Sequence, residues 1–306
     1  MEPVSKLQAV LCNESENLAV RFRALFSLKH LGVNGDTKAI DAIAAAFSSE
    51  SALLKHELAY CLGQTKNTYA VRPLTERLED PNEAAICRHE SAEALAAIGG
   101  ADCLPLLRKY LNDEEEAVRQ TCELAIAKIE YDLSKEAKTE DLQKSAFASI
   151  DPAPPLPSSM KSIPELQDIL NDQSRTLFYR YRAMFRLRDI GTPEAIDALA
   201  TGFGDPSALF RHEVAFVFGQ MSDAHSKDSL IKVLADTNED GMVRHEAAEA
   251  LGSIGLPEID EELKKYVTDS ERLVRDSAVV ALDMSAFEKS GDFEYALVPT
   301  AGEVEA

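Results

Sequence analysis

The chain repeats itself at two scales, and this repetition constrains its fold more than any other feature. CRHESAEALAAIG at residues 87–99 returns as VRHEAAEALGSIG at residues 243–255, an offset of 156 residues. RFRALFSLKHLG at residues 21–32 matches RYRAMFRLRDIG at residues 180–191 at an offset of 159. The three additional residues lie in a Gly/Asn-rich turn of the first half, where insertions cost little. The two halves are therefore expected to share one fold.

A shorter period of 33 residues runs inside each half. A basic residue followed by His-Glu occurs at residues 55–57 and 88–90, and again at residues 211–213 and 244–246. Periods of this length are typical of stacked helical hairpins. Amphipathic stretches joined by polar turns, as at residues 80–82, agree with this interpretation. We predict an all-α, HEAT-like helical-hairpin solenoid with two pseudo-symmetric halves of about four repeats each.

The repeats and the composition between them predict four segments. An N-terminal HEAT-repeat half covers residues 1–131, and a C-terminal half covers residues 164–285. Between them, residues 132–163 are rich in proline and small polar residues, so they are expected to form a linker rather than part of a core. Residues 286–306 have no clear periodicity and are predicted to form a flexible acidic tail.

The net charge limits the classes of partner. The chain has 53 acidic and 32 basic residues, a formal charge of −21. Such a field repels phosphate backbones, so nucleic acid is excluded and a basic protein or an amine is favoured. The N-terminus lacks a basic region followed by an apolar run, and no stretch approaches the roughly 20 apolar residues of a membrane span. We expect no secretion and no membrane partner.

Cysteine usage indicates a reducing compartment. The five cysteines are all in the first half and have no metal-type spacing, so we expect reduced and mostly buried thiols. They are Cys12, Cys61, Cys87, Cys103 and Cys122. The expected location is the cytoplasm.

Four of the six histidines are each followed directly by glutamate. These are His56, His89, His212 and His245, and both repeat periods relate them to one another. Core packing requires apolar side chains at equivalent positions and does not explain a repeated imidazole beside a carboxylate. The other two histidines fall outside the pattern. We expect His30 and His225 to be surface residues without a chemical role.

The solenoid would bring the histidines together. The second helices of adjacent hairpins lie side by side, so His56 should neighbour His89, and His212 should neighbour His245. If the linker lets the two halves face each other about a pseudo-twofold axis, all four pairs converge on a shared metal cleft. Four imidazoles and four carboxylates at close range would be costly without positive charge to balance the acids. Two divalent metal ions would balance them.

The donor types narrow the choice of metal. Imidazole and carboxylate donors suit iron, manganese or catalytic zinc. Cys61 and Cys87 are close to the pairs in sequence, but their counterparts in the second half are Val217 and Val243. The symmetry therefore argues against thiolate ligands.

Helix geometry separates the two residues of each pair. Neighbouring residues on a helix point about 100° apart, so His and Glu of one pair do not grip one ion from the same direction. Two histidines and one glutamate would bind an ion, and the second glutamate would be free to hold a cationic substrate. Glu93 and Glu249 follow His89 and His245 by four residues and would either support the imidazoles or be exposed helix acids.

Two sets of four HEAT-type repeats, each with His-Glu at a 33-residue interval, resemble the deoxyhypusine hydroxylase family over residues 17–285. The resemblance implies a di-iron monooxygenase that uses O2 and two Fe²⁺ ions. Its implied substrate is the deoxyhypusine side chain of eukaryotic translation initiation factor 5A, which becomes hypusine. A further hypothesis is that the acidic surface attracts a basic loop of this partner, an effect that salt would weaken.

The resemblance also assigns roles to the motif residues, and all eight positions match. The implied metal ligands are His56, His89 and Glu90 for one iron, and His212, His245 and Glu246 for the other. Glu57 and Glu213 would then be the catalytic acids that position the substrate amine.

Two other functions compete with this interpretation. HEAT-like arrays are often non-catalytic binding scaffolds, as in the similar repeats of bilin lyases, and the repeats alone would favour a scaffold. A two-zinc hydrolase could use the same His/Glu set. The four His-Glu pairs favour the hydroxylase over the scaffold, and identification of the bound metal would separate it from the hydrolase.

Overall fold

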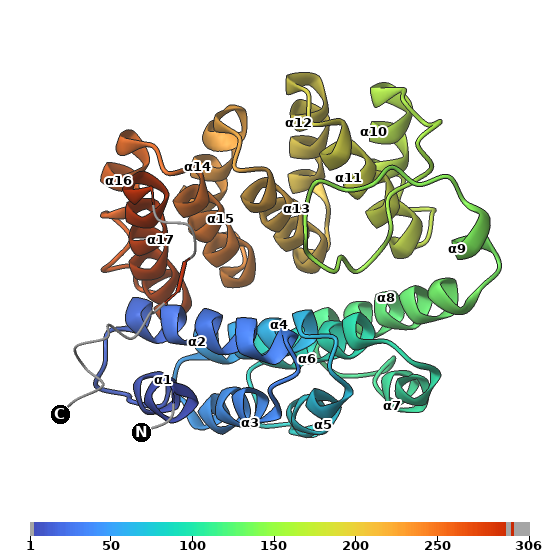
Figure 1. Ribbon diagram of the computed structural model, residues 1–306. Coiled ribbons are helices and arrows are strands. Elements are labelled where there is room, and N and C mark those ends of the chain that lie inside the picture. Colours follow the sequence, from blue (N-terminus) through green and yellow to red (C-terminus); the bar gives the residue numbers. More distant parts are fainter. Residues whose placement is uncertain (1–2, 292–294, 297–306) are drawn as a thin grey trace. The chain divides into compact units, whose positions relative to one another are not determined.

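A computed structural model describes residues 3–291 and 295–296, and this part of the chain contains helices and no strand. Paired helices form hairpins in both halves of the chain (Figure 1). In the first half the pairs are α1 (Pro3–Leu11) with α2 (Leu18–Val33), α3 (Thr37–Ala45) with α4 (Ala52–Gln64), α5 (Val71–Glu79) with α6 (Ala85–Ile98), and α7 (Leu104–Lys109) with α8 (Glu116–Leu133).

The second half repeats this order. The pairs are α10 (Ile163–Asn171) with α11 (Leu177–Ile190), α12 (Pro193–Ala200) with α13 (Ala208–Met221), α14 (Lys227–Ala235) with α15 (Gly241–Ile254), and α16 (Pro257–Leu263) with α17 (Arg272–Ser290). Between the halves lies the short α9 (Glu136–Thr139). Brief 3-10 turns precede or follow several helices: η1 (Ala46–Ser48), η2 (Thr68–Ala70), η3 (Ala101–Cys103), η4 (Thr201–Gly204) and η5 (Ala224–Ser226). The all-α hairpin fold and about four hairpins per half are confirmed.

The compact units of the structure meet one hairpin earlier in the chain than the two repeated halves of the sequence do. One compact unit holds residues up to Gly99 and those from Ser290 onward, and the other holds Gly100–Lys289. The hairpin α7/α8 is the fourth repeat of the first half, but α8 contacts α11 and α13 of the second unit. There the Ser207 hydroxyl donates a hydrogen bond to Gln120 Oε1 at 2.6 Å. The predicted boundaries describe repeats, and as domain boundaries they remain a prediction.

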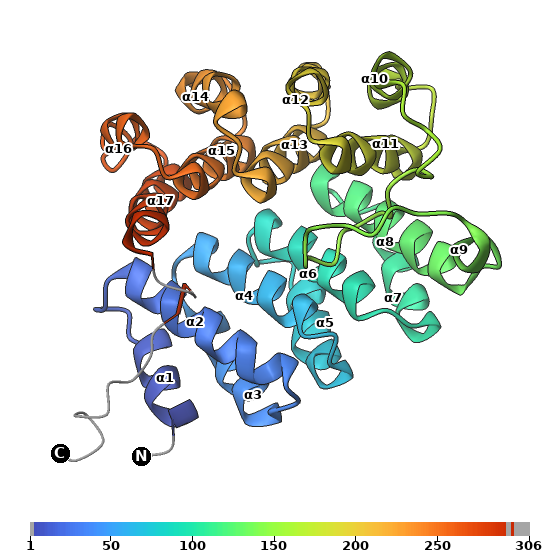
Figure 2. The ribbon, with the colours of Figure 1, turned by 45° about the horizontal axis from the view of Figure 1, so that its top comes forward.

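Each unit consists of two layers of helices. In the second unit, α11, α13, α15 and α17 form one layer and α10, α12, α14 and α16 the other (Figure 2). In the first unit, α2, α4 and α6 lie on α1, α3 and α5 (Figure 1). The first helix of a hairpin buries a single stripe of apolar side chains, which in α14 consists of Leu230, Val233 and Leu234. The second helix is covered on most sides, and every His-Glu pair is on a second helix.

A repeated arginine joins the two helices of four hairpins. In each case its Nε–H donates to a backbone carbonyl ten residues earlier, at the end of the first helix. The bonds run from Arg21 to Leu11, Arg88 to Leu78, Arg180 to Leu170 and Arg244 to Leu234, with lengths of 2.8, 3.1, 2.8 and 3.0 Å. Carbonyls at a helix C-terminus lack a partner within the helix. The arginine that precedes His89 or His245 is therefore explained by the fold.

The basic residues before the other two histidines connect successive hairpins. Arg211 binds Glu239 with two hydrogen bonds, of 2.8 and 2.6 Å, just before α15 begins. Lys55 forms an ion pair with Glu83 just before α6 begins. Each pair ties one His-Glu helix to the start of the next, so the basic position of the motif is structural throughout.

Small residues allow neighbouring His-Glu helices to pack closely. A Cβ atom placed on Gly63 of α4 would lie 2.7 Å from Ala94 Cα of α6. A Cβ atom on Gly219 of α13 would lie 3.3 Å from Ala250 Cα of α15. Both distances are shorter than ordinary van der Waals contact, so the helices depend on glycine at these positions.

The segment predicted as a linker, residues 132–163, contributes to the core of the second unit. Ala153 and Leu156 are fully buried among the apolar side chains of that unit. The Leu156 backbone N–H donates to the Arg182 carbonyl of α11 at 3.0 Å. The expectation that this segment lies outside any core is wrong for these two residues.

Arginines of α11 explain why a proline-rich segment can be held there. Proline has no backbone N–H, and the proline-rich part of this segment forms neither a helix nor a strand. Its carbonyl groups therefore need hydrogen-bond donors from other parts of the chain. Arg182 donates to the Pro155 carbonyl at 3.2 Å, and Arg186 donates to the Met160 carbonyl at 2.9 Å. Composition alone indicated a linker because these donors come from the second half of the chain.

The C-terminal helix extends further than its sequence periodicity indicates. Residues 286–290 of the predicted flexible tail continue α17, while residues 292–294 and 297–306 of that tail lie outside the described residues. Ser285 is buried, and its hydroxyl donates to Asp260 Oδ1 at 2.5 Å. Lys289 pairs with the other oxygen of Asp260. The helix therefore continues into the first five residues of the predicted tail.

The thiols agree with the expectation of mostly buried cysteines. Four of the five cysteines are buried, Cys12 is exposed, and the described chain contains no disulfide. Burial raises the pKa of Cys87 to about 12, so its thiol stays protonated near neutral pH.

Across residues 3–291 and 295–296, every helix is too short or too polar to traverse a lipid bilayer.

Substituting Gly63→Ala should force α4 and α6 apart. Overpacking costs about 1–3 kcal/mol, and the higher helix propensity of alanine offsets up to about 1 kcal/mol of that cost. We expect a net loss in the free energy of unfolding, measured by urea denaturation. Gly204→Ala is the control, because no atom lies within 4 Å of its added Cβ. Equal stability of the two variants would contradict the close packing.

Substituting Asp269→Asn should remove a pH-dependent contribution to stability. Arg244 donates to Asp269 Oδ2 at 2.6 Å, and this bond lowers the pKa of the carboxyl. The stabilisation is complete above the unfolded-state pKa of about 3.9 and is lost as the pH falls through the lower folded-state value. At pH 7 the variant should lose about 1.5–3 kcal/mol, and the difference should shrink below about pH 4. Glu76→Gln, in an exposed pair with Arg72, should change little.

Candidate metal centre

The four histidines occupy the same position in their helices. His56, His89, His212 and His245 are each the fifth residue of α4, α6, α13 and α15. Two of these helices begin in the same way, because the hydroxyls of Ser51 and Ser207 accept hydrogen bonds from Leu54 N and Phe210 N. Equal helix starts in side-by-side helices place the imidazoles at equal heights.

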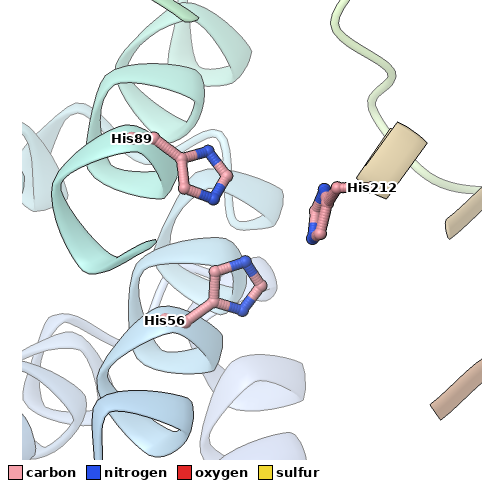
Figure 3. A group of neighbouring side chains, drawn as sticks. All are labelled: His56, His89 and His212. Carbon is pink, nitrogen blue, oxygen red and sulfur yellow. The ribbon is translucent and has the colours of Figure 1, made fainter. Parts of the chain in front are cut away.

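In the first unit, His56 and His89 form a pair of neighbouring rings. Their centroids are 5.5 Å apart with an interplanar angle of 37°, and both rings point to the same side of their helices (Figure 3). His56 Nε2 lies 3.3 Å from Glu90 Oε2. All three side chains are buried. The predicted ligands of the first metal position thus lie close to one another.

The second unit repeats this arrangement closely. The ring centroids of His212 and His245 are 5.4 Å apart with an angle of 38°. His212 Nε2 lies 3.4 Å from Glu246 Oε2, and all three side chains are buried. The same local structure therefore occurs twice, as the duplicated sequence predicts.

The donor atoms fit a divalent metal ion. His212, His245 and Glu246 each offer one ligand atom, and these atoms lie within 4.8 Å of one another. The corresponding group in the first unit consists of His89, Glu90 and Glu93, so it has one imidazole and two carboxylates and does not include His56. Nitrogen and carboxylate oxygen donors in such buried groups suit a borderline ion such as Fe²⁺, Mn²⁺ or Zn²⁺.

Two cysteine thiols near the His/Glu group of the first unit form hydrogen bonds with other protein atoms. Cys61 Sγ donates to Glu57 Oε1 at 3.7 Å, and Cys87 Sγ donates to the Lys55 carbonyl at 3.7 Å. Burial raises the pKa of the Cys61 thiol well above its usual value, which opposes thiolate formation. The geometry supports the prediction that the ligands are imidazole and carboxylate groups.

Glu57 and Glu213 are buried but lie outside these compact groups. They are 8% and 2% exposed, and among the described residues neither belongs to a cluster of three potential ligands. This placement is compatible with a role other than metal binding, and their assignment to the substrate amine remains a prediction.

Glu249 lies beside the ring of His245. Its Oε1 is 3.5 Å from His245 Nδ1, and its side chain is only 14% exposed. The same oxygen accepts a hydrogen bond of 3.1 Å from the Ser277 hydroxyl of α17. Glu249 is therefore not an exposed helix acid, which was the alternative that the sequence left open.

Ser277 lies outside the His-Glu motifs of the sequence. The sequence does contain a signal for this residue, because Ser277 and Thr121 occupy equivalent positions at the offset of 156 residues and both carry hydroxyl groups. The signal was weak, since serine and threonine are common on helices that have no site.

The two histidines outside the pattern are on the surface, as predicted. His30 is exposed on α2. The side chain of His225 is 41% exposed, and its Nε2 lies 2.8 Å from Asp197 Oδ1. Neither belongs to a potential metal-binding group in the described chain.

Comparison with known proteins identifies the repeats. Residues 4–96 and 201–283 match the family of HEAT repeats. Residues 88–113 and 179–205 match the PBS lyase HEAT-like repeat.

Several known proteins match nearly the whole chain. A deoxyhypusine hydroxylase of Phaeosphaeria nodorum is 54% identical and covers 99% of this chain and 97% of its own length. One of Candida albicans is 54% identical and covers 96% of each chain. The structure of human deoxyhypusine hydroxylase in complex with glycerol is 43% identical, with a TM-score of 0.87 over 93% of this chain and 96% of its own. From this identity over nearly its whole length, the chain belongs to the deoxyhypusine hydroxylase family.

Proposed function

We propose that this chain hydroxylates the deoxyhypusine side chain of eukaryotic translation initiation factor 5A to give hypusine. The observation that carries the proposal is the pair of matching His/Glu groups on α4/α6 and α13/α15. Family membership supports the reaction, because relatives that are 54% identical over nearly the whole chain are named for it. The chain is then an oxidoreductase of the monooxygenase class.

The proposed cofactor is a pair of Fe²⁺ ions. His56, His89 and Glu90 would hold one ion, and His212, His245 and Glu246 the other. When bound, the irons would supply the activation of O2, which the unactivated C–H bond of the substrate requires and amino-acid side chains cannot provide.

The protein would contribute orientation and charge. The deoxyhypusine side chain carries ammonium groups, and Glu57 and Glu213 would pair with them. Because both carboxylates are buried, such pairs are stronger than they would be in water. Fixing the amines fixes the carbon that faces the metal ions, and this positioning lowers the barrier.

The proposed partner agrees with the charge of the chain. A formal charge of −21 favours a basic protein surface and disfavours nucleic acid. Attraction of this kind acts mainly on the association rate and weakens with salt. A cytoplasmic location is proposed from the free cysteines of the described chain.

The metal assignment predicts iron-dependent activity. Protein loaded with Fe²⁺ under anaerobic conditions should bind about two ions per chain. With O2 it should convert about one equivalent of a deoxyhypusine-containing factor to hypusine, because the two Fe²⁺ ions supply the two electrons that a single turnover requires. His245→Ala should lower the bound iron to about one ion or less, because one imidazole ligand is lost. Metal content by mass spectrometry and hypusine by amino-acid analysis provide the measurements.

His225→Ala is the matched control, since this exposed histidine should leave iron content and activity unchanged. Retention of zinc with hydrolytic activity would instead indicate the two-zinc hydrolase. A chain that binds no metal would indicate the scaffold.

The substrate assignment predicts a different result for the remaining glutamates. Glu57→Ala or Glu213→Ala should leave bound iron near the wild-type level and weaken binding of the substrate by about 10-fold or more, because one charge-assisted contact to an ammonium is lost. Binding is measured by titration with the deoxyhypusine-containing factor. Loss of most of the iron in either variant would show that these acids are ligands.

A further inference from the structure

Helix α17 carries no His-Glu pair, yet one of its side chains contacts Glu249, which lies beside His245 of the second His/Glu group. Ser277 is fully buried, and its hydroxyl donates to Glu249 Oε1 at 3.1 Å. That oxygen lies 3.5 Å from His245 Nδ1. A chain of three side chains thus connects the last helix of the array to an imidazole.

Close packing fixes the serine relative to the histidine. A Cβ atom placed on Gly252 of α15 would lie 2.7 Å from Ala281 Cα of α17. Val274, about one helical turn before Ser277, and Ala278, directly after it, are also fully buried. Because backbone packs on backbone here, the hydroxyl has little freedom to move away from Glu249.

A carboxylate beside one ring nitrogen of a histidine can orient the other ring nitrogen toward a metal ion. A histidine that binds a metal through one ring nitrogen usually presents the other to a carboxylate, which sets its orientation and raises its basicity. With Nδ1 toward Glu249, His245 keeps Nε2 for the ion, and Nε2 lies 4.0 Å from Glu246 Oε2. A donor on Glu249 stabilises the carboxylate in this position.

We propose that Ser277 is a positioning residue of the second metal position. It holds Glu249, and Glu249 holds His245 with Nε2 directed at the ion. This inference rests on the proposed function only in taking His245 as a ligand. It assigns the last repeat, which contributes no ligand, a role in metal affinity.

The first half of the chain offers a natural comparison. Thr121 of α8 is the repeat equivalent of Ser277, and its Oγ1 is buried without a hydrogen-bond partner among the described residues. The threonine hydroxyl therefore does not support an acid as the serine hydroxyl does. The proposal predicts that the two metal positions respond differently when these hydroxyls are removed.

The test measures metal binding by the full-length chain. Wild type, Ser277→Ala, Ser277→Thr and Thr121→Val are titrated anaerobically with Fe²⁺, and with Co²⁺ as a spectroscopic probe. We expect Ser277→Ala to weaken binding of one of the two ions by about 10–100-fold and to alter the Co²⁺ spectrum. Ser277→Thr restores the hydroxyl and should recover most of the affinity, while Thr121→Val should match wild type.

The outcomes separate this inference from the proposed function. If wild type binds no divalent ion, the proposed metal centre fails and the inference fails with it. If wild type binds two ions and Ser277→Ala binds them equally well, only the inference fails. Equal weakening of both ions in Ser277→Ala would also overturn it, because a local contact should affect one position.

A second variant covers the case in which Ser277→Ala does not fold. Glu249→Gln keeps an acceptor for the serine and removes the charge beside His245. Weaker binding of one ion with an unchanged circular dichroism spectrum supports the proposal. Wild-type affinity in Glu249→Gln overturns it.

Discussion

The contact between neighbouring second helices is the constraint on which the site depends. Gly63 against Ala94, and Gly219 against Ala250, allow α4 to pack on α6 and α13 on α15 almost backbone to backbone. Because each histidine is the fifth residue of its helix, this packing sets the ring separations at 5.5 and 5.4 Å. A wider helix separation would leave the donor atoms too far apart to share an ion.

Burial of the His-Glu pairs opposes folding unless something balances them. Carboxylates are costly to remove from water unless a positive charge or hydrogen bonds compensate for their charge. The surrounding arginines do not serve this purpose at the second group, because Arg211 and Arg244 are bound to Glu239 and Asp269. In the proposed function, divalent ions provide the balancing charge, so the site and its stability depend on the same electrostatics.

The rest of the fold holds these helices in register. Arginines close the hairpins through helix-terminal carbonyls, and Lys55 and Arg211 tie one His-Glu helix to the start of the next. The last repeat adds α17, which packs on α15 and places Ser277 beside Glu249. Repeats without ligands therefore contribute to the site by fixing the helices that carry them.

The sequence by itself determined the helical-hairpin repeats, the neighbouring histidine pairs and the donor types, because all three follow from local periodicity and from repetition at fixed intervals. Only the tertiary structure decided that Leu156 of the proline-rich segment is buried, that α17 continues past residue 285, and that Ser277 contacts Glu249. Each of these depends on a donor or an acceptor far away in the chain, such as Arg182 for Leu156 and Asp260 for Ser285. Periodicity reports which face of a helix is covered, and it does not report which distant residue covers it.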